Sequence, residues 1–588
     1  MAPPLRPVLV LALDGASFDV IRPMAEAGEL PNLSAWMKEG LAAPLASTAP
    51  PVTFPAWSSF MTGLSPGEHG IFDFTQKVPG DYRLRFVNAS DRAGRTLFRR
   101  VGDAGGRVLV LGLPATHPPE PVAGLLVCGF EAPVASGTDP RSASDPERYR
   151  RIAAKAGPWM RPELDESAKA SDFHERAVAT LLARIDRKRD FALAALEDLR
   201  TDREGRLPDL TVVVFSESDT AGHHYFRDHD PRSPRHDPAA STERKDALRA
   251  VHRRLDQACG ALRAAVGPDV RCVVLSDHGM GTASDKIVHL NRFLAEQGLL
   301  VRSRPLHGAL GGLGRLAGLA STDGLARTAR DLALAWLPPT IAQLVFRRAR
   351  GAAALVESRA RFGGFDWRRT LAFSEEANTQ PGVWINLEGR EPEGCVAPAD
   401  YEATRDRVIA ALLAWRLPSG EPVVARALRR EAVYSGPFVE CAPDVVLELA
   451  LDAGHGLSLV ATPWAEGGPD GEGIPSVRTL GPAELAGGRG RGMNGTHRGE
   501  GIFIDCGAPR GAGADPGADA DPASPAPRRL ADVAPWLARA MGLAWAADGD
   551  PRAGRPDGSG TDTNARVAYD EDEEAMVAER LRALGYLE

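Results

Sequence analysis

The chain has 588 residues and a formal net charge of −8, so it is long enough to bury a large core. This charge is small for the length, no basic block is present and aromatic residues are few, so we expect no binding to nucleic-acid polymers. The cysteines are widely spaced without a CxxC pair, which argues against a disulfide framework and a zinc–thiolate site. We expect small, buried thiols at Cys128, Cys259, Cys272, Cys395, Cys441 and Cys506.

The N-terminal stretch MAPPLRPVLVLALDGA is too short in its apolar run for a signal peptide and predicts a buried first strand. No run approaches the roughly 20 apolar residues of a membrane span. The nearest candidate, 332–346, is interrupted by Pro338 and Pro339. We therefore expect a soluble, cytoplasmic protein without a transmembrane segment, although 332–346 could touch a membrane surface.

Strands and helices alternate through the first half of the chain. Residues 7–13 are continuously apolar, which is typical of a parallel strand covered on both faces. Two helices are expected within 19–40, and another from Pro55 to a stop at Gly63. Further strands are expected at 107–113, 124–130, 211–218 and 271–277, and helices at 95–105, 144–200 and 241–266. This alternation predicts a doubly wound, mostly parallel α/β sheet with helices on both faces.

The second half changes character, which predicts a core that is divided in the sequence. Residues 1–299 form its first part, with a helical segment at about 140–205, and 366–545 form its second part. Between them, 300–365 predict a helical insertion or lid. Strands are expected at 382–387, 422–428, 444–450 and 501–505, and a helix at 530–543. A disordered loop at 507–528 and a flexible tail at 546–588, ending in a helix at 571–586, complete the chain.

Chemistry-bearing residues follow three of the expected strands. Asp14, Asp219 and Asp277 each come just after an apolar run, and ligands of α/β sheets bind at the carboxyl ends of such strands. Three carboxylates there would repel one another unless cations held them. Asp219 and His223 are four residues apart and share a face of a starting helix, and His278 adjoins Asp277.

Two further residues complete the hypothesis. His497 precedes an apolar run in the second half, and mixed Asp and His ligands suit zinc or manganese better than calcium or magnesium. Thr53 lies at a loop-to-helix junction, where backbone N–H groups favour an anion. Two ions about 3.5–4 Å apart hold both oxygens of a phosphoryl displacement, and coordination activates a hydroxyl. We therefore predict two divalent ions, zinc or alternatively manganese, with Thr53 as nucleophile.

Several residues have simpler interpretations when taken singly. Asp14 could cap a helix, His223 could be a surface histidine and His69 a structural one. Arg498 could bind phosphate through its guanidinium or lie on the surface. The segment after His223 predicts an exposed loop, with substrate contact as the alternative for His224, His229 and His236.

Taken in order, the motifs LDG, TFPAWSSFMTG, SPGEHGI, DTAGH, SDHGM and THRGEGIF resemble the alkaline phosphatase superfamily. The most similar branch is that of type I phosphodiesterases and nucleotide pyrophosphatases, including predicted phosphohydrolases and phosphomutases. GVWINLEGREPEG at 382–394 and the final RLRALGYLE resemble the same branch. The resemblance spans most of the chain apart from 300–365 and the low-complexity loop, and it implies an alkaline-phosphatase-like core.

The resemblance also implies roles. One ion would be held by Asp14, Thr53, Asp277 and His278, and the other by Asp219, His223 and His497. Thr53 would attack phosphorus and form a phosphothreonine, which water then hydrolyses with net retention. The implied activity is hydrolysis of a small phosphodiester or phosphomonoester. The alternatives are a phosphomutase or phosphotransferase, or an inactive metal-binding regulatory protein.

Two positions depart from patterns in the superfamily. Nucleotide pyrophosphatases carry an asparagine where this chain has Phe74, which weakens the case for nucleotide diesters. Sulfatases need a C/S-x-P-x-R segment, whereas this chain has TFPAW, which argues against sulfatase activity. Phe74, His224 and Arg498 are the candidate substrate contacts; the substrate itself and the oligomeric state are not predicted.

Overall fold

The computed structural model describes residues 4–132, 140–159, 173–202, 205–303, 364–377, 379–464, 474–487, 491–507, 526–545, 569 and 571–583. The expected insertion at 300–365 lies almost entirely outside the described residues, as do most of the 507–528 loop and the tail before the last helix. No helix in the described part combines the length and apolarity needed to cross a membrane.

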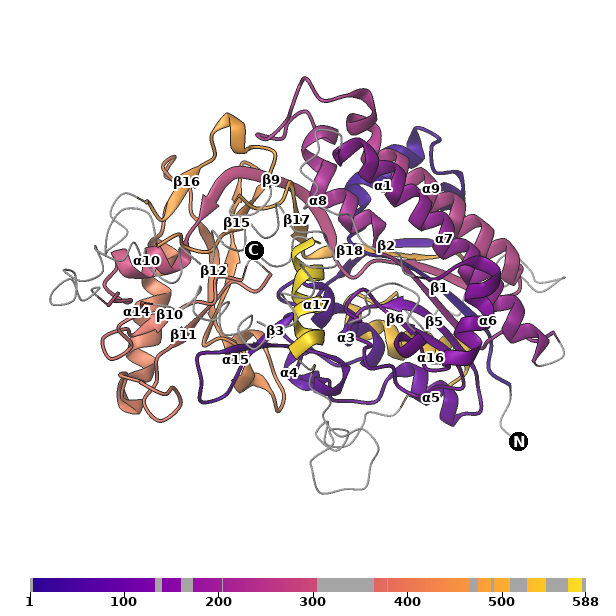
Figure 1. Ribbon diagram of the computed structural model, residues 1–588, viewed down its shortest axis with the longest axis horizontal. Helices are drawn as coiled ribbons and strands as arrows, with labels where there is room; N and C mark the ends of the chain where they lie inside the picture. Colours follow the sequence, from indigo (N-terminus) through magenta and orange to yellow (C-terminus); the bar gives the residue numbers. More distant parts are fainter. Residues whose placement is uncertain are drawn as a thin grey trace, which may run out of the picture.

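A seven-stranded sheet forms the centre of the larger part of the molecule (Figure 1). Its order is β2 (Leu41–Ala46), β18 (Glu500–Asp505), β8 (Arg271–Leu275), β1 (Val8–Leu13), β7 (Leu210–Phe215), β5 (Val108–Leu113) and β6 (Gly124–Cys128). β1 pairs in parallel with both β7 and β8, and β5 is parallel to β6 and β7. Only β18 runs against its neighbours. The prediction of a mostly parallel sheet is confirmed.

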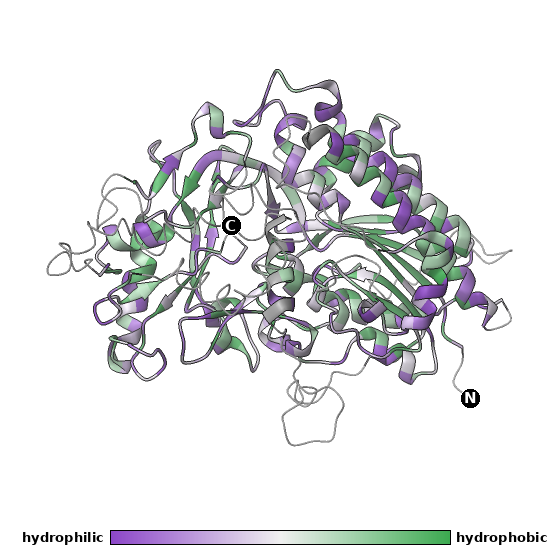
Figure 2. Ribbon diagram, viewed as in Figure 1, coloured by the Kyte–Doolittle hydropathy of each residue, from purple (hydrophilic) through white to green (hydrophobic). Residues whose placement is uncertain are grey.

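Helices cover both faces of this sheet because its strands are apolar on both sides. Leu9, Leu11 and Leu13 of β1 pack into one buried cluster, and the alternate residues of the strand pack into a second. Figure 2 shows the strands as hydrophobic and the outer sides of the helices as largely hydrophilic. The first face is covered by α1 (Phe18–Glu26), α2 (Pro31–Glu39), α6 (Pro146–Ala156), α7 (Phe173–Thr201), α8 (Glu217–His229) and α9 (Thr242–Val266). The second is covered by α3 (Thr53–Thr62), α5 (Leu97–Asp103) and α16 (Val533–Met541).

The second half of the chain mostly builds separate sheets. Of its described strands and α-helices, only β18 and α16 join the seven-stranded sheet and its cover. A four-stranded antiparallel sheet lies on the other side of the molecule with α10 (Leu290–Glu296) and α14 (Tyr401–Ala414) (Figure 1). Its order is β10 (Ala372–Phe373), β11 (Gly382–Ile385), β13 (Val445–Leu449) and β12 (Val424–Arg429). In the chain, the short helix α15 (Arg430–Val433) follows β12 directly.

A long strand that the sequence analysis did not predict connects the two sides. β9 (Gly279–Val288) begins directly after His278 and arches between them (Figure 1). Its sequence, GMGTASDKIV, mixes glycines and polar residues, so no apolar alternation marks it. β9 pairs with three strands: β15 (His455–Leu459), β16 (Val477–Thr479) and β17 (Gly495–Arg498). β15 pairs in addition with β14 (Leu451–Asp452). The pairing with β17 places His497 opposite Met280, next to the end of β8.

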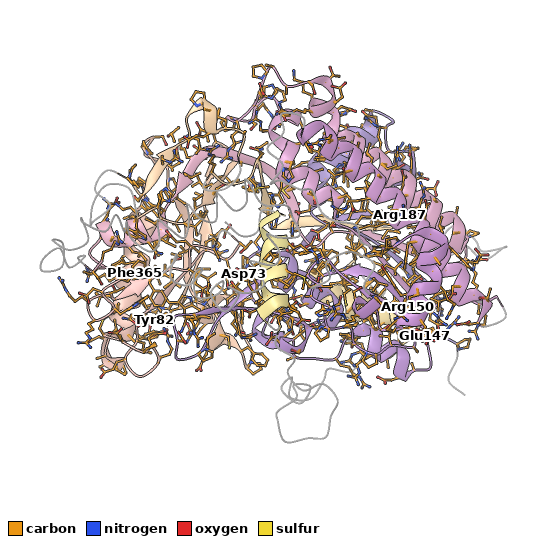
Figure 3. The ribbon with its side chains drawn as sticks, viewed as in Figure 1. Asp73, Tyr82, Glu147, Arg150, Arg187 and Phe365 are labelled. Carbon is orange, nitrogen blue, oxygen red and sulfur yellow. The ribbon has the colours of Figure 1, made fainter. Side chains whose placement is uncertain are left out.

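The hairpin of β3 (Thr75–Lys77) and β4 (Leu84–Phe86), which follows the short α4 (Pro66–His69), joins the first half to the four-stranded sheet. Tyr82 in its turn stacks on Trp367 with ring centroids 3.6 Å apart, and Lys77 forms a buried 2.7 Å ion pair with Glu391. Figure 3 shows Tyr82 on the same side as Phe365, whereas Asp73 lies near the middle. The last helix, α17 (Glu571–Ala583), lies between the two sides in this view, with Val577 and Leu581 in the buried cluster that contains Val52 and Phe54 (Figure 1).

Candidate active site

Thr53 is the first residue of α3, and its side chain is fully buried. The helix ends at Gly63 with φ of 71°, as predicted from the glycine. The N–H of Ala56 is the first to bond within the helix, to the carbonyl of Val52. Thr53 therefore lies where helical N–H groups point outward, a position that favours an anion. Its Oγ1 lies 3.5 Å from Nε2 of His278.

Asp14 and Asp277 follow the neighbouring strands β1 and β8, and each has one oxygen held by the protein. The N–H of Gly15 donates to Oδ1 of Asp277 at 3.2 Å, and the indole of Trp57 donates to Oδ2 of Asp14 at 3.4 Å. The other oxygens, Asp14 Oδ1 and Asp277 Oδ2, are buried and accept no hydrogen bond from the described residues. They lie 3.6 and 3.4 Å from Nε2 of His278. Both carboxylates thus present an oxygen to one point beside Thr53.

The three histidines are held by backbone carbonyls in the same way. Nδ1 of His223 bonds to the carbonyl of Gly495, that of His278 to Gly279 and that of His497 to Pro51, at 3.0, 3.0 and 2.8 Å. A carbonyl only accepts, so each Nδ1 carries a proton, and Nε2 is the atom that each ring can offer to a ligand or an ion. Metal-bound histidines are oriented by this kind of contact.

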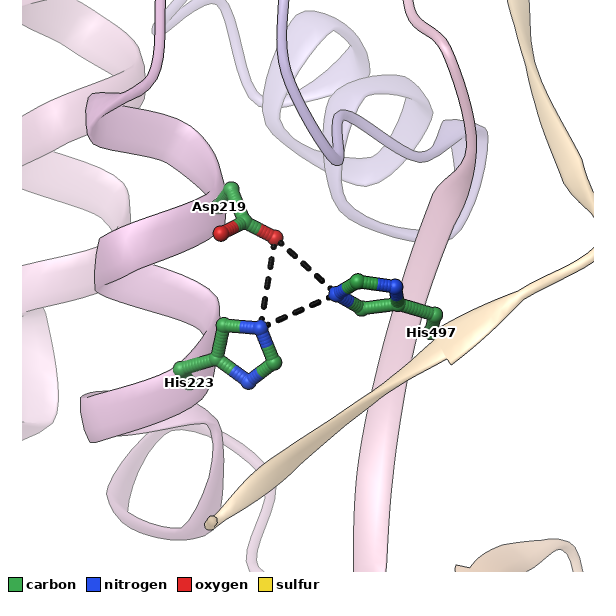
Figure 4. A group of neighbouring side chains, drawn as sticks. All are labelled: Asp219, His223 and His497. Carbon is green, nitrogen blue, oxygen red and sulfur yellow. Dashed lines mark hydrogen bonds and ion pairs between the residues drawn. The ribbon is translucent and has the colours of Figure 1, made fainter. Parts of the chain in front are cut away.

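A second group contains Asp219, His223 and His497. Figure 4 shows Asp219 and His223 on one helix, α8, facing His497 on a strand. Nε2 of His223 lies 3.0 Å from Nε2 of His497, and Oδ1 of Asp219 lies 3.4 Å from each. Two lone pairs at this distance repel unless a proton or a cation is shared between them. The predicted sharing of a helix face by Asp219 and His223 is seen here.

Asp219 also connects the two groups. A carboxylate oxygen of Asp219, one of Asp14 and a ring nitrogen of His278 form a second set of possible metal ligands that lie within 4.8 Å of one another. Gly15 makes this approach possible, because its φ is +65° and an added Cβ would lie 2.9 Å from Asp219 Oδ1. All seven predicted ligands, which include the predicted nucleophile Thr53, therefore lie around one buried site: Asp14, Thr53, Asp219, His223, Asp277, His278 and His497.

The pKa shifts follow from this crowding. Burial, and then the charges of the other carboxylates, raise the pKa of Asp14 and raise that of Asp277 to about 8. Burial lowers the pKa of His223 to about 4, so that ring is neutral. Burial also acts to lower the pKa of His497, but Asp219 outweighs it and raises the pKa. Buried carboxylates that repel one another beside the Nε2 atoms of three histidines fit divalent cations, which would relieve the repulsion and use the nitrogens as ligands.

Residues 8–466 match one family profile, and this range carries every predicted ligand except His497. The chain belongs to the type I phosphodiesterase / nucleotide pyrophosphatase family. It is thus a hydrolase of phosphoric esters from a metal-dependent family, and the resemblance to the branch of type I phosphodiesterases and nucleotide pyrophosphatases is confirmed.

Solved structures with a similar fold were also found. Phosphonoacetate hydrolase from Sinorhizobium meliloti 1021 in complex with phosphonoformate is 16% identical, covering 92% of this chain and 96% of that chain at a TM-score of 0.46. Human ectonucleotide pyrophosphatase / phosphodiesterase 5 is 11% identical, covering 92% and 97% at a TM-score of 0.40. No curated protein matches the sequence.

Two residues near Thr53 belong to the core. The ring of Phe74 is buried, with its centroid 4.5 Å from that of Phe54, so it supports the first turn of α3. His69 is buried, its Nδ1 accepts the N–H of Ile71 and its Nε2 donates to Ser59 Oγ. The structural interpretation of His69 is confirmed by these contacts.

The prediction of an exposed loop after His223 was wrong for 224–229, whereas 230–240 do form an irregular segment between two helices in which Pro231 and Arg232 are exposed. α8 continues to His229, and His224 is buried with 6% of its surface exposed. Arg498 is partly exposed, and its guanidinium donates to Thr496 Oγ1 and to the carbonyls of Thr282 and Gly454. It lies next to His497 on β17, so its side chain points to the opposite face of the strand. The sequence analysis also missed Gly15, although a glycine directly after a strand-end aspartate is a visible signal.

Proposed function

We propose that the protein is a phosphohydrolase that cleaves a phosphodiester or phosphomonoester through a phosphothreonine on Thr53, with two divalent ions. Asp14, Asp277 and His278 would hold one ion with Thr53, and Asp219, His223 and His497 the other. Zinc suits these donors best, with manganese as the alternative. Bound ions of this kind lower the pKa of a coordinated hydroxyl or water and offset charge on phosphoryl oxygens.

The observation that carries the proposal is the orientation of the histidines. All three rings donate Nδ1–H to carbonyls and turn Nε2 toward buried carboxylate oxygens. A core built only for stability would avoid this arrangement, because Asp14 Oδ1 and Asp277 Oδ2 are buried and accept no hydrogen bond from the described residues. Divalent ions satisfy all of these acceptors at once.

The chain's own residues suit phosphoryl transfer to Thr53. The hydroxyl lies at the N-terminus of α3, where outward N–H groups can receive the phosphoryl oxygens. Oγ1 gives up its proton and attacks phosphorus, and the bond from phosphorus to the ester oxygen breaks, so that the leaving group departs as an alcohol after taking up a proton. A water then attacks the phosphothreonine, breaks its P–O bond and restores the hydroxyl of Thr53, which releases phosphate from a monoester or a phosphomonoester from a diester. Trp57 and Gly15 keep the two carboxylates in place during both steps through their hydrogen bonds.

The test compares the wild type with Thr53→Ala. Bound zinc and manganese are quantified, and turnover is measured with bis-p-nitrophenyl phosphate and p-nitrophenyl phosphate. We expect about two ions in the wild type, and a variant that keeps bound metal but loses turnover. An active Thr53→Ala would exclude the nucleophile, and a wild type without transition metal would exclude the two-ion site. An added acceptor alcohol separates hydrolysis from transfer.

A further inference from the structure

Arg235 has an environment that its sequence context does not suggest. It lies in the turn segment between α8 and α9, surrounded by proline and charged residues. Its side chain is nevertheless completely buried, with 0% of its surface exposed. Arg232, three residues earlier, has a side chain that is 85% exposed and pairs only with Asp230 among the described residues. The two arginines of this segment therefore differ in their environment, because Arg235 lies in the protein interior and Arg232 lies in solvent.

Within the described part of the chain, the guanidinium of Arg235 donates only to backbone carbonyls. Nε donates to Ser284 of β9 at 2.7 Å. Nη2 donates to Arg491 at 3.0 Å, and Nη1 donates to Gly492 and Met493 at 3.3 and 3.1 Å. One planar group thus ties three consecutive carbonyls of a loop to β9. Burial lowers the pKa of Arg235 to about 10, which leaves it charged at neutral pH.

The loop held by Arg235 leads directly into the second ligand group. Its next residue, Asn494, donates its N–H to the carbonyl of His223 at 2.9 Å and its side-chain amide to that of His224 at 3.2 Å. The residue after that, Gly495, supplies the carbonyl that orients His223. β17 then places His497. The position of both histidines therefore depends on where residues 491–493 lie.

We propose that Arg235 is a positioning residue that fixes the 491–495 loop and thereby aligns His223 and His497 for binding of one divalent ion. This inference rests on the proposed function, because it concerns the second of the two ions. Arg235 does not touch the ligands and acts only through the loop. The fork of the guanidinium matters more than its charge, since a lysine ammonium cannot span carbonyls on two sides.

The test is zinc titration of metal-free protein, supported by the absorption spectrum of the cobalt-substituted form. In Arg235→Gln we expect one ion to bind as in the wild type and the other about 10–100-fold more weakly, the range seen when contacts behind metal ligands are lost. Arg235→Lys should show the same selective weakening. His497→Ala provides the reference spectrum of a chain whose second group is disabled.

Two controls separate positioning from general loss of structure. Arg430→Gln removes another buried arginine that bonds to carbonyls, those of Glu440 and Ala442, and Arg232→Gln removes the exposed neighbour. Both should bind two ions like the wild type. Wild-type affinity for both ions in Arg235→Gln or Arg235→Lys would overturn the inference, and so would equal weakening of both ions. If Arg235→Gln does not fold, Arg235→Lys decides. A wild type that binds fewer than two ions would instead refute the proposed function.

Discussion

The two ligand groups are built in different ways. Asp14 and Asp277 follow strands that pair directly in one sheet, so backbone hydrogen bonds of β1 and β8 set their separation. His223 lies on a helix and His497 on a strand of another sheet, and the loop that leads into that strand is tied down by the side chain of Arg235. A site placed by a sheet is insensitive to single contacts, whereas one placed by a loop depends on them. The second group should therefore be the easier one to disturb from a distance.

Among the variants that test this comparison, we expect the largest loss of activity from Asp277→Asn, which is to be compared with His497→Ala. Asp277 presents its oxygen to the point beside Thr53, so its loss removes the first ion and turnover together. Several kcal/mol of lost transition-state stabilisation corresponds to roughly 1000-fold in kcat. His497→Ala should keep one ion and lose less activity. Metal content and kcat of both variants are measured in parallel.

The metal-free proteins provide the control for this pair. Without ions, burial and then the charge of Asp219 raise the pKa of Asp277 to about 8, so near neutral pH the metal-free protein must bind a proton there to fold, which costs free energy. Asp277→Asn removes this cost, so its metal-free form should melt at or above the temperature of the metal-free wild type. Added zinc should then raise the melting temperature of the wild type more. A metal-free variant that melts well below the metal-free wild type would contradict the view that these buried carboxylates destabilise the fold unless cations are bound.

A smaller effect is expected at the glycine where the two groups meet. Gly15→Ala places a Cβ 2.9 Å from Asp219 Oδ1 at a φ of +65°, so Asp219 must shift. Displacement of a catalytic group by a fraction of an ångström to 1 Å lowers kcat by roughly 10–100-fold. The matched control is Gly28→Ala, with a φ of +77° and no atom within 4 Å. Both variants carry a strain of about 1–2 kcal/mol, but only Gly15→Ala should lose activity. Similar kcat values in the two variants would show that Asp219 tolerates the contact.

The sequence predicted the first group well for a physical reason. Apolar runs followed by aspartate mark the carboxyl ends of parallel strands, and such ends meet at one edge of a sheet whatever the loops do. Asp14 and Asp277 were found in this way, as was Asp219 together with the helical spacing to His223. Pro55 and Gly63 marked the helix that begins at Thr53.

What the sequence did not show depends on tertiary contacts. β9 lacks an apolar alternation because its neighbours and bulged pairing bury it irregularly. Arg235 occurs in a turn rich in proline and charge, and only the carbonyls of a distant loop make it a core residue. Neither feature leaves a local pattern of hydrophobicity or spacing, so both had to be seen in the structure.

The smallest effect is expected at Arg498, which tests whether the second group also recognises phosphate. Its guanidinium is engaged by Thr282 and Gly454, so Arg498→Gln should leave KM for p-nitrophenyl phosphate within about twofold of the wild type. A charged hydrogen bond to substrate is worth about 1.5–3 kcal/mol, so an arginine that held the phosphoryl group would raise KM roughly 10–100-fold when removed. Arg232→Gln, an exposed arginine, controls for loss of a positive charge. A tenfold rise in KM for Arg498→Gln alone would mean that two adjacent side chains of β17 contribute to the reaction: His497 would bind the ion and Arg498 would contact the substrate.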